Sequence, residues 1–264
     1  MPTPSILIVG AMDRELRTLL SFYQCSLSTK LQGSYPLWHS TIKRPFEIKV
    51  LQTFVGDINA SISTALAISS FNPDYVFKMG CVGGSSIGLH TGDTIMPVGF
   101  FSTTSWITRS RIDNKPTSDA SLWQSVFGDK PYQVTSDNLG GTPYYFKSDV
   151  VLGERYKRFF ANRNQKLVSA YIGGGNVWVF DLAYAKNVSR TQIPGGSSKR
   201  IWAADMESYA IAQTCYTYKK PFMGFYRVSD NYFENERYIP GKVAEFFDEN
   251  FILTVDIFLK TMVN

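Results

Sequence analysis

Apolar positions in the first hundred residues alternate between short continuous runs and helical spacing. Residues 5–9 are a compact, β-branched apolar run that ends at Gly10, which is typical of a buried parallel strand. Asp13 to Tyr23 then carries large apolar residues three and four positions apart, the spacing of a helix with one buried face. The alternation continues and predicts strands over 46–55, 75–79 and 93–98 and a helix over 58–70.

The C-terminal half repeats this alternation after the polar stretch 101–148, which is rich in Tyr and Trp and interrupted by Pro and Gly. Strands that alternate with helices predict a mostly parallel sheet covered by helices on both faces. We therefore expect a single-domain, three-layer α/β/α fold over residues 1–264 with a central, mostly parallel (mixed) sheet, and an insertion-like segment at about 101–148. The further predicted elements are helices over 150–160, 181–188, 205–218 and 243–262 and strands over 167–171, 176–180, 201–204 and 222–228.

Cysteine and histidine usage argues against a metal site. The 264 residues include three cysteines, Cys25, Cys81 and Cys215, which form no close pair, and only two histidines. Free thiols suit a reducing, cytoplasmic setting. The N-terminus has the pattern of a buried strand and not that of a signal peptide. Because no stretch approaches the roughly 20 apolar residues of a membrane helix, we expect a soluble protein that does not bind a membrane.

Basic residues outnumber acidic ones and give a formal net charge of +5. They are scattered in short pairs, such as Lys43–Arg44 and Lys219–Lys220, and do not gather in one run. A nucleic-acid-binding protein would concentrate them on one face, so we expect no nucleic-acid partner. A mildly basic surface can still attract a small anionic ligand.

Candidate catalytic and binding residues lie where predicted strands end, because ligands of parallel α/β sheets bind beyond the carboxyl ends of the strands. Residues 10–15, 78–84, 205–207 and 229–231 each follow such an end. Each also has a purely structural explanation. Glu207 in the first turn of a helix complements the helix dipole, Asp230 can be a turn residue, and Glu15 can be a solvated helix carboxylate. Together these residues predict one cleft.

These segments together resemble the nucleoside phosphorylase/nucleosidase superfamily, and within it the methylthioadenosine/S-adenosylhomocysteine nucleosidases. GAM-x-x-E near the start, DMES-x-AIA and a late Ser-Asp pair are specific as a set, and about 100–165 is unmatched. The resemblance rests on residues 6–15 (ILIVGAMDRE), 54–62 (FVGDINASI), 72–97, 203–215 (AADMESYAIAQTC) and 226–231 (YRVSDN).

The resemblance implies a role for each carboxylate. Asp230, oriented by Ser229, matches the acid that protonates the departing purine at N7, and burial can raise its pKa enough to keep the proton. Glu207 matches the carboxylate that holds the ribose hydroxyls near the developing positive charge, with Met206 packed under the sugar. Glu15 matches the carboxylate that positions or deprotonates the attacking water, on the opposite side of the sugar.

Other residues are expected to bind the base or to line the pocket. Trp178 and Val179 resemble the segment that carries a base-stacking aromatic, with the Val179 backbone bonding the purine edge. The alternative for Trp178 is a core aromatic. Cys81, Val82 and Gly83 lie in a glycine-rich run that either lets the backbone approach a ligand or lets the strand turn. We interpret Cys81 as a small packing residue and not as a nucleophile.

The attacking group is predicted from opposing signals. Glu15 is present, as in nucleosidases, but Arg14 and Lys78 fall near the arginines with which phosphorylases bind phosphate, and lysine binds phosphate as a point charge. The Cys81 thiol is a poor hydrogen-bond donor to phosphate, which favours water as the attacking group. A purine nucleosidase is therefore the favoured function and a phosphorylase the alternative. An inactive nucleoside-binding or storage protein is a third hypothesis, against which the retained carboxylates argue.

The resemblance implies no cofactor and no metal, a small nucleoside substrate, and a homodimer in which a neighbour often closes the pocket. The identity of the nucleoside is left open. Arg237 and Tyr238 flank the expected pocket. Arg109 and Arg111 can meet a phosphate or carboxylate of the substrate, although solvated loop arginines are the plainer interpretation.

Overall fold

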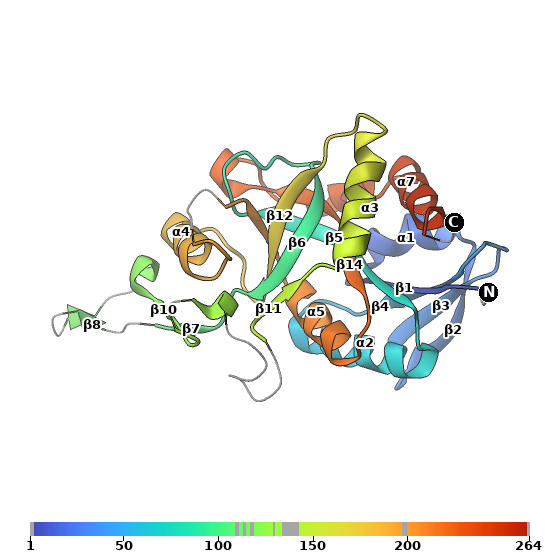
Figure 1. The fold of residues 1–264 in the computed structure, drawn as a ribbon, viewed down its shortest axis with the longest axis horizontal. Helices are drawn as coiled ribbons and strands as arrows, with labels where there is room; N and C mark the ends of the chain where they lie inside the picture. Colours follow the sequence, from blue (N-terminus) through green and yellow to red (C-terminus); the bar gives the residue numbers. More distant parts are fainter. Residues whose placement is uncertain are drawn as a thin grey trace.

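Ten strands form one mixed sheet in the computed structural model, which describes residues 3–108, 111–112, 115–116, 119–128, 130–133, 143–196 and 200–262. Figure 1 shows this sheet running through the middle of the molecule, with short elements projecting at one end. Its strands are β1 (Ser5–Gly10), β2 (Cys25–Leu31), β3 (Tyr35–Ser40), β4 (Glu47–Gln52), β5 (Tyr75–Gly84), β6 (Thr94–Ser102), β11 (Tyr145–Lys147), β12 (Val168–Gly174), β13 (Trp202–Asp205) and β14 (Phe222–Asp230).

Strand pairing in the sheet is partly parallel and partly antiparallel. β1 pairs in parallel with β4 and β5, β5 with β14, and β12 with both β6 and β13. β13 pairs antiparallel with β5, and β14 antiparallel with β6. The strands β5, β14, β6, β12 and β13 therefore close into a ring, and β1, β4 and the β2–β3 hairpin extend from it. The predicted mixed central sheet is confirmed.

Helices cover both faces of the sheet, which confirms the three predicted layers (Figure 1). Along β1, Ile6 and Ile8 pack in the core that α1, α3 and α7 cover, whereas Leu7 and Val9 pack in the core under α2 and α5. This alternation follows from the two-residue period of a strand. The helices are α1 (Asp13–Phe22), α2 (Asp57–Phe71), α3 (Val150–Ala161), α4 (Leu182–Thr191), α5 (Ser208–Thr217), α6 (Val243–Phe246) and α7 (Glu249–Lys260).

Aspartates cap several of these helices. Asp149, Asp181 and Asp248 each accept a hydrogen bond from a backbone N–H in the first turn of α3, α4 and α7, respectively. The prediction of one closing helix over 243–262 is wrong, because the helix is interrupted between α6 and α7. Phe247 is fully buried at the break, and Asp248 begins the second helix there.

The segment 101–148 packs against α4 through a third apolar core. The rings of Trp106 and Trp123 lie 5.7 and 5.9 Å from the Tyr184 ring, and the Asn187 amide donates to the carbonyls of Ala120 and Trp123. The segment carries short elements at one end of the molecule (Figure 1): β7 (Trp106–Ile107), β8 (Arg111–Ile112), β9 (Lys115–Pro116), η1 (Ala120–Leu122), β10 (Gln124–Ser125) and η2 (Pro131–Gln133).

Two other differences from the sequence prediction lie close to the pocket described below, and a third lies at the edge of the sheet. Residues 176–180 form no strand, and the glycine-rich run 80–84 is part of β5 instead of a turn. The hairpin of β2 and β3 was not predicted.

Among the described residues, no helix has the length and apolar character needed to cross a membrane.

Candidate active site

One pocket collects the residues that follow the strand ends. It lies where β1, β13 and β14 end, beside the last residues of β5, and Asp230 pairs in register with Gly83 there. Three carboxylates that the sequence singled out line it together with predicted binding residues. The lining residues are Ala11, Met12, Glu15, Val55, Cys81, Gly83, Gly84, Ser85, Val177, Trp178, Val179, Ala204, Asp205, Met206, Glu207, Ser229, Asp230 and Tyr238.

Glu15 lies in the first turn of α1 with its side chain buried at one wall of the pocket. Its Oε2 accepts hydrogen bonds from the backbone N–H groups of Ala11 (3.0 Å) and Met12 (2.9 Å), and its Oε1 accepts one from Cys81 (2.9 Å). Burial raises the pKa of Glu15 to about 7, against the opposing charge of Lys78 and these hydrogen bonds. Glu15 can therefore exchange a proton near neutral pH.

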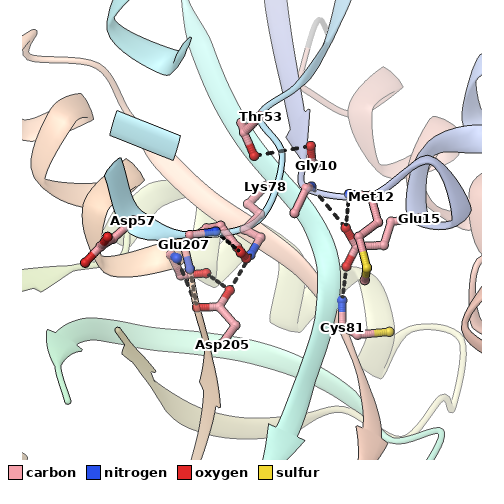
Figure 2. Close-up of polar contacts among 12 residues, drawn as sticks. Gly10, Met12, Glu15, Thr53, Asp57, Lys78, Cys81, Asp205 and Glu207 are labelled. Atoms are coloured by element: carbon pink, nitrogen blue, oxygen red, sulfur yellow. Dashed lines mark hydrogen bonds and ion pairs between the residues drawn. The ribbon is translucent and has the colours of Figure 1, made fainter. Parts of the chain in front are cut away.

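Glu207 lies at the opposite side of β5 in Figure 2, where its carboxylate is held from two directions. Oε1 accepts from the backbone N–H of Gly56 (3.0 Å), and Oε2 accepts from the buried ammonium of Lys78 (2.7 Å). Lys78 also donates to Asp205. Glu207 directly precedes α5, so the prediction that it lies in the first helical turn is wrong.

Asp230 is the last residue of β14, and its side chain is almost fully buried. Its Oδ1 accepts a hydrogen bond from the Ser229 hydroxyl at 2.6 Å. Burial raises the pKa of Asp230, while hydrogen bonds from Ser229 and Trp178 oppose that rise. The raised pKa is what a carboxyl group needs in order to hold a proton for a leaving group.

Trp178 and Tyr238 form an aromatic wall of the pocket. Their ring centroids are 5.1 Å apart in an edge-to-face arrangement. Trp178 is 51% exposed, so its ring is not a core aromatic and has a face available to a ligand. The irregular segment that carries Trp178 is fixed by Asn176, whose amide donates to Asp57 at 2.8 Å.

Three predicted binding residues do not line the pocket. Val82 is buried in the core under α2 and α5. Arg14 donates to the Pro240 carbonyl at 2.9 Å, and Lys78 is enclosed by carboxylates. Of the other candidates, Tyr238 lines the pocket, Arg237 is exposed outside it, and Arg109 and the Arg111 side chain lie outside the described residues.

The sequence interpretation missed the supporting residues. Residues 205–207 were noted at a strand end and 54–62 in the family resemblance, but neither pattern assigned a role to Asp205, Gly56 or Asp57, because each acts through residues far away in the sequence. Asp205 does accept from the backbone N–H of Ser208 at 2.9 Å, as a cap would. Within the described ranges, no group of His, Cys, Asp and Glu side chains is arranged to hold a metal ion.

Fold and pocket together define an α/β protein with a carboxylate-lined site for a small organic ligand. Residues 5–257 match the family model of the phosphorylase superfamily, and the chain belongs to this family.

Known relatives agree with this assignment. The chain is 26% identical over 223 residues to the 5′-methylthioadenosine/S-adenosylhomocysteine nucleosidase of Staphylococcus aureus strain MRSA252, covering 84% of this chain and 85% of the relative. The nucleosidase of Neisseria meningitidis, solved with methylthio-immucillin-A, is similar in fold, with a TM-score of 0.67, 22% identity and coverage of 97% and 99% of the two chains. Futalosine hydrolase of Helicobacter pylori gives a TM-score of 0.69 at 18% identity, with 99% and 97% covered.

Proposed function

We propose that this protein is a purine nucleosidase that hydrolyses the N-glycosidic bond of methylthioadenosine- or S-adenosylhomocysteine-like nucleosides. The observation that carries the proposal is the meeting of Glu15, Glu207 and Asp230 in one pocket, with the pKa of Glu15 and of Asp230 raised by burial. The similarity to nucleosidases supports the same reaction class.

Each carboxyl group has a distinct task in the proposed reaction. Asp230 gives its proton to N7 of the purine, so that the base leaves with the electron pair of the broken C–N bond. Glu207 accepts hydrogen bonds from the ribose hydroxyls and stabilises the positive charge that develops on the sugar. Glu15 takes a proton from the water whose oxygen bonds to the anomeric carbon. Proton exchange with solvent then restores Asp230 and Glu15.

The base and the sugar are proposed to bind between side chains of the pocket. Trp178 stacks on the purine, the backbone of Val179 and the residues from Cys81 to Gly83 approach it closely, and Met206 packs under the ribose. Trp178, Val179 and Met206 line the same pocket as the carboxylates, which supports this arrangement. Because Val82 is buried behind the lining, only its backbone is available for this role.

Water is favoured over phosphate because neither predicted phosphate-binding cation lines the pocket. Lys78 already pairs with two carboxylates, which would repel a phosphate brought next to it. Arg14 is held by the Pro240 carbonyl. Among the residues that the structure describes, the pocket lining therefore lacks the positive charge that a phosphorylase places around its nucleophile.

The nucleophile and the substrate are tested together. Purified protein is expected to release free base from methylthioadenosine, S-adenosylhomocysteine or futalosine in phosphate-free buffer, measured by chromatography. Glu15→Gln and Asp230→Asn should each lower kcat by about 10²- to 10⁴-fold, the usual contribution of general acid–base catalysis. Arg14→Gln serves as the matched control and should keep normal hydrolysis.

Two outcomes would contradict the proposal. Release that requires added phosphate would establish the phosphorylase alternative. Tight binding of purine nucleosides without turnover of any of them would establish a binding or storage protein.

We also propose a cytoplasmic homodimer with no cofactor. Free thiols at Cys25, Cys81 and Cys215 suit a reducing compartment. Phe54, Val55, Ile58 and Ile62 are exposed where α2 begins, and Val55 also lines the pocket, so an apolar surface continues from the pocket edge onto the helix.

A further inference from the structure

A buried lysine in the candidate site has no place in the proposed reaction so far. The Lys78 side chain is 1% exposed, and its Nζ lies between Asp205 Oδ2 and Glu207 Oε2. Figure 2 shows its ammonium pointing at these two carboxylates. An ammonium has three donors and no acceptor, so these two ion pairs use most of its capacity.

Neighbouring polar groups fix both partners of Lys78. Asp205 also accepts from the backbone N–H and the hydroxyl of Ser208, and that hydroxyl lies 2.7 Å from the Tyr226 hydroxyl. The second oxygen of Glu207 is held by the N–H of Gly56. With one oxygen on Lys78 and the other on Gly56, the plane of the Glu207 carboxylate is defined.

Lys78 is also close to Glu15, on the other side of Gly80. A Cβ at Gly80 would lie 3.0 Å from Glu15 Oε1 and 3.1 Å from Lys78 Cε, so the absence of a side chain leaves room for the Glu15 carboxylate and the Lys78 side chain beside the same backbone position. The charge of Lys78 lowers the pKa of Glu15, and the charge of Glu207 raises it. Lys78 therefore contacts one catalytic carboxylate and acts on another through space.

The ionisable groups around Glu15 come from several elements. Lys78 and Cys81 act on it from β5, Glu207 from the position just before α5, and Tyr238 from the segment after β14. Among these groups Lys78 carries the positive charge, so its removal leaves groups that are neutral or negative.

We propose that Lys78 is a positioning residue for the nucleosidase reaction, fixing the orientation of Glu207 against the ribose and favouring the ionised form of Glu15 across Gly80. This inference rests on the proposed function. Lys78, which lies near the expected phosphate-binding position, would then act in hydrolysis without contacting the attacking water.

The experiment compares Lys78→Met with Lys78→Arg. In Lys78→Met, kcat/KM is expected to fall about a hundredfold, the cost of misplacing reacting groups by about 1 Å. The midpoint of the acid limb, in the profile of kcat/KM against pH, should also move to a higher pH than in the wild type. The reason is that the cation that favours ionised Glu15 is gone. Lys78→Arg keeps the charge, so its acid limb should stay near that of the wild type even where kcat falls.

Two results would overturn the inference. One is a folded Lys78→Met whose acid limb coincides with that of the wild type. The other is a Lys78→Arg profile displaced as far as that of Lys78→Met. If Lys78→Met does not fold, the double variant Lys78→Met/Asp205→Asn removes the lysine together with one carboxylate charge, and the same upward displacement is expected.

A second experiment distinguishes failure of the proposed function from failure of this inference. If the wild type hydrolyses no nucleoside, the same comparison is made on the pH dependence of unfolding, with Glu15→Gln variants as references. The Glu15-dependent change in unfolding free energy should then extend to higher pH in Lys78→Met than in the wild type. An unchanged pH range would overturn the role of Lys78 whatever the substrate.

Discussion

Glu15 shows how burial and hydrogen bonding compete at a single carboxyl group. Its three backbone donors all favour the charged form, as does Lys78. Desolvation nevertheless has the largest effect and raises the pKa to about 7. The same burial that excludes water from the carboxylate thus brings its pKa into the range that the proposed role, taking a proton from one water molecule, requires.

The raised pKa of Glu15 makes stability depend on pH. Below pH 4.5 the group is protonated in both folded and unfolded chains, and between 4.5 and about 7 only the folded chain retains the proton. The folded state therefore loses stability from this group as pH rises through that window. Relative to Glu15→Gln, the wild type should lose up to about 3 kcal/mol between pH 4 and pH 8.

Chemical denaturation of the two proteins at a series of pH values measures this difference. A difference that stays constant across the window, or that changes in favour of the wild type, would show that Glu15 titrates normally. The comparison cancels the contributions of the other carboxylates, because both proteins contain them.

Single residues were predictable where a short motif carries them, and not where they act through partners distant in the sequence. Glu15, Glu207 and Asp230 each follow a strand end in a recognisable pattern, and the structure brings them to one pocket. The partners of Lys78 are Asp205 and Glu207, which lie 127 and 129 residues further along the chain. They meet Lys78 only because the end of β13 and the start of α5 fold against β5. The sequence therefore made Lys78 a possible phosphate-binding residue in the phosphorylase alternative, and the structure has it beside carboxylates.

At the scale of elements, hydrophobic periodicity identified most of the strands and helices of the sheet and its two layers. It failed where tertiary contacts override local pattern. The glycine-rich run 80–84 stays extended because it pairs with β13 and β14 on its two sides. Residues 176–180 have the composition of a strand, yet Trp178 and Phe180 are both exposed there. In the β2–β3 hairpin, β2 is largely exposed and β3 is mostly half-buried, so neither strand carries a strong apolar pattern.

The irregular segment after β12 depends on the start of α2 for its position. Asn176 and Asp57 exchange two hydrogen bonds, at 2.8 and 3.3 Å, two residues before Trp178. Asn176→Ala should therefore raise KM for the nucleoside roughly tenfold, since a hydrogen bond to a charged group is worth about 1.5 kcal/mol. Its unfolding free energy should fall by no more than about 1.5 kcal/mol, because the same hydrogen bond is lost when the wild type unfolds.

Steady-state kinetics and denaturation on the same preparation test this link. Asn164→Ala, at an exposed asparagine after α3, is the matched control and should leave KM unchanged. An Asn176→Ala variant with normal KM would mean that Trp178 is held by its aromatic contacts alone.

At the scale of the whole molecule, the apolar surface beside the pocket supports the proposed dimer. Ile58 is 69% exposed at the start of α2, on the same helix face as Ile62. Ile58→Asp would bury a charge in that interface and should weaken the dimer by more than about tenfold, ~1.4 kcal/mol. Light scattering coupled to size exclusion, over a range of concentrations, measures the change.

Ile87→Asp is the matched control, because Ile87 is 72% exposed on the loop after β5, outside the α2 surface. It should leave the dissociation constant unchanged. A wild type that is monomeric at all concentrations would contradict the dimer, and an Ile58→Asp variant that stays dimeric would assign the interface to another surface.

The closed ring of five strands also governs when this protein can first be active during its synthesis. β14 pairs with both β5 and β6, although some 120 residues separate its first residue from the end of β6. Asp230 is carried on β14, so a nascent chain that has emerged only as far as α5 has neither a closed ring nor the carboxyl group that we propose as the general acid. Contacts between such distant segments form slowly. The final third of the chain thus decides both the completion of folding and the onset of activity.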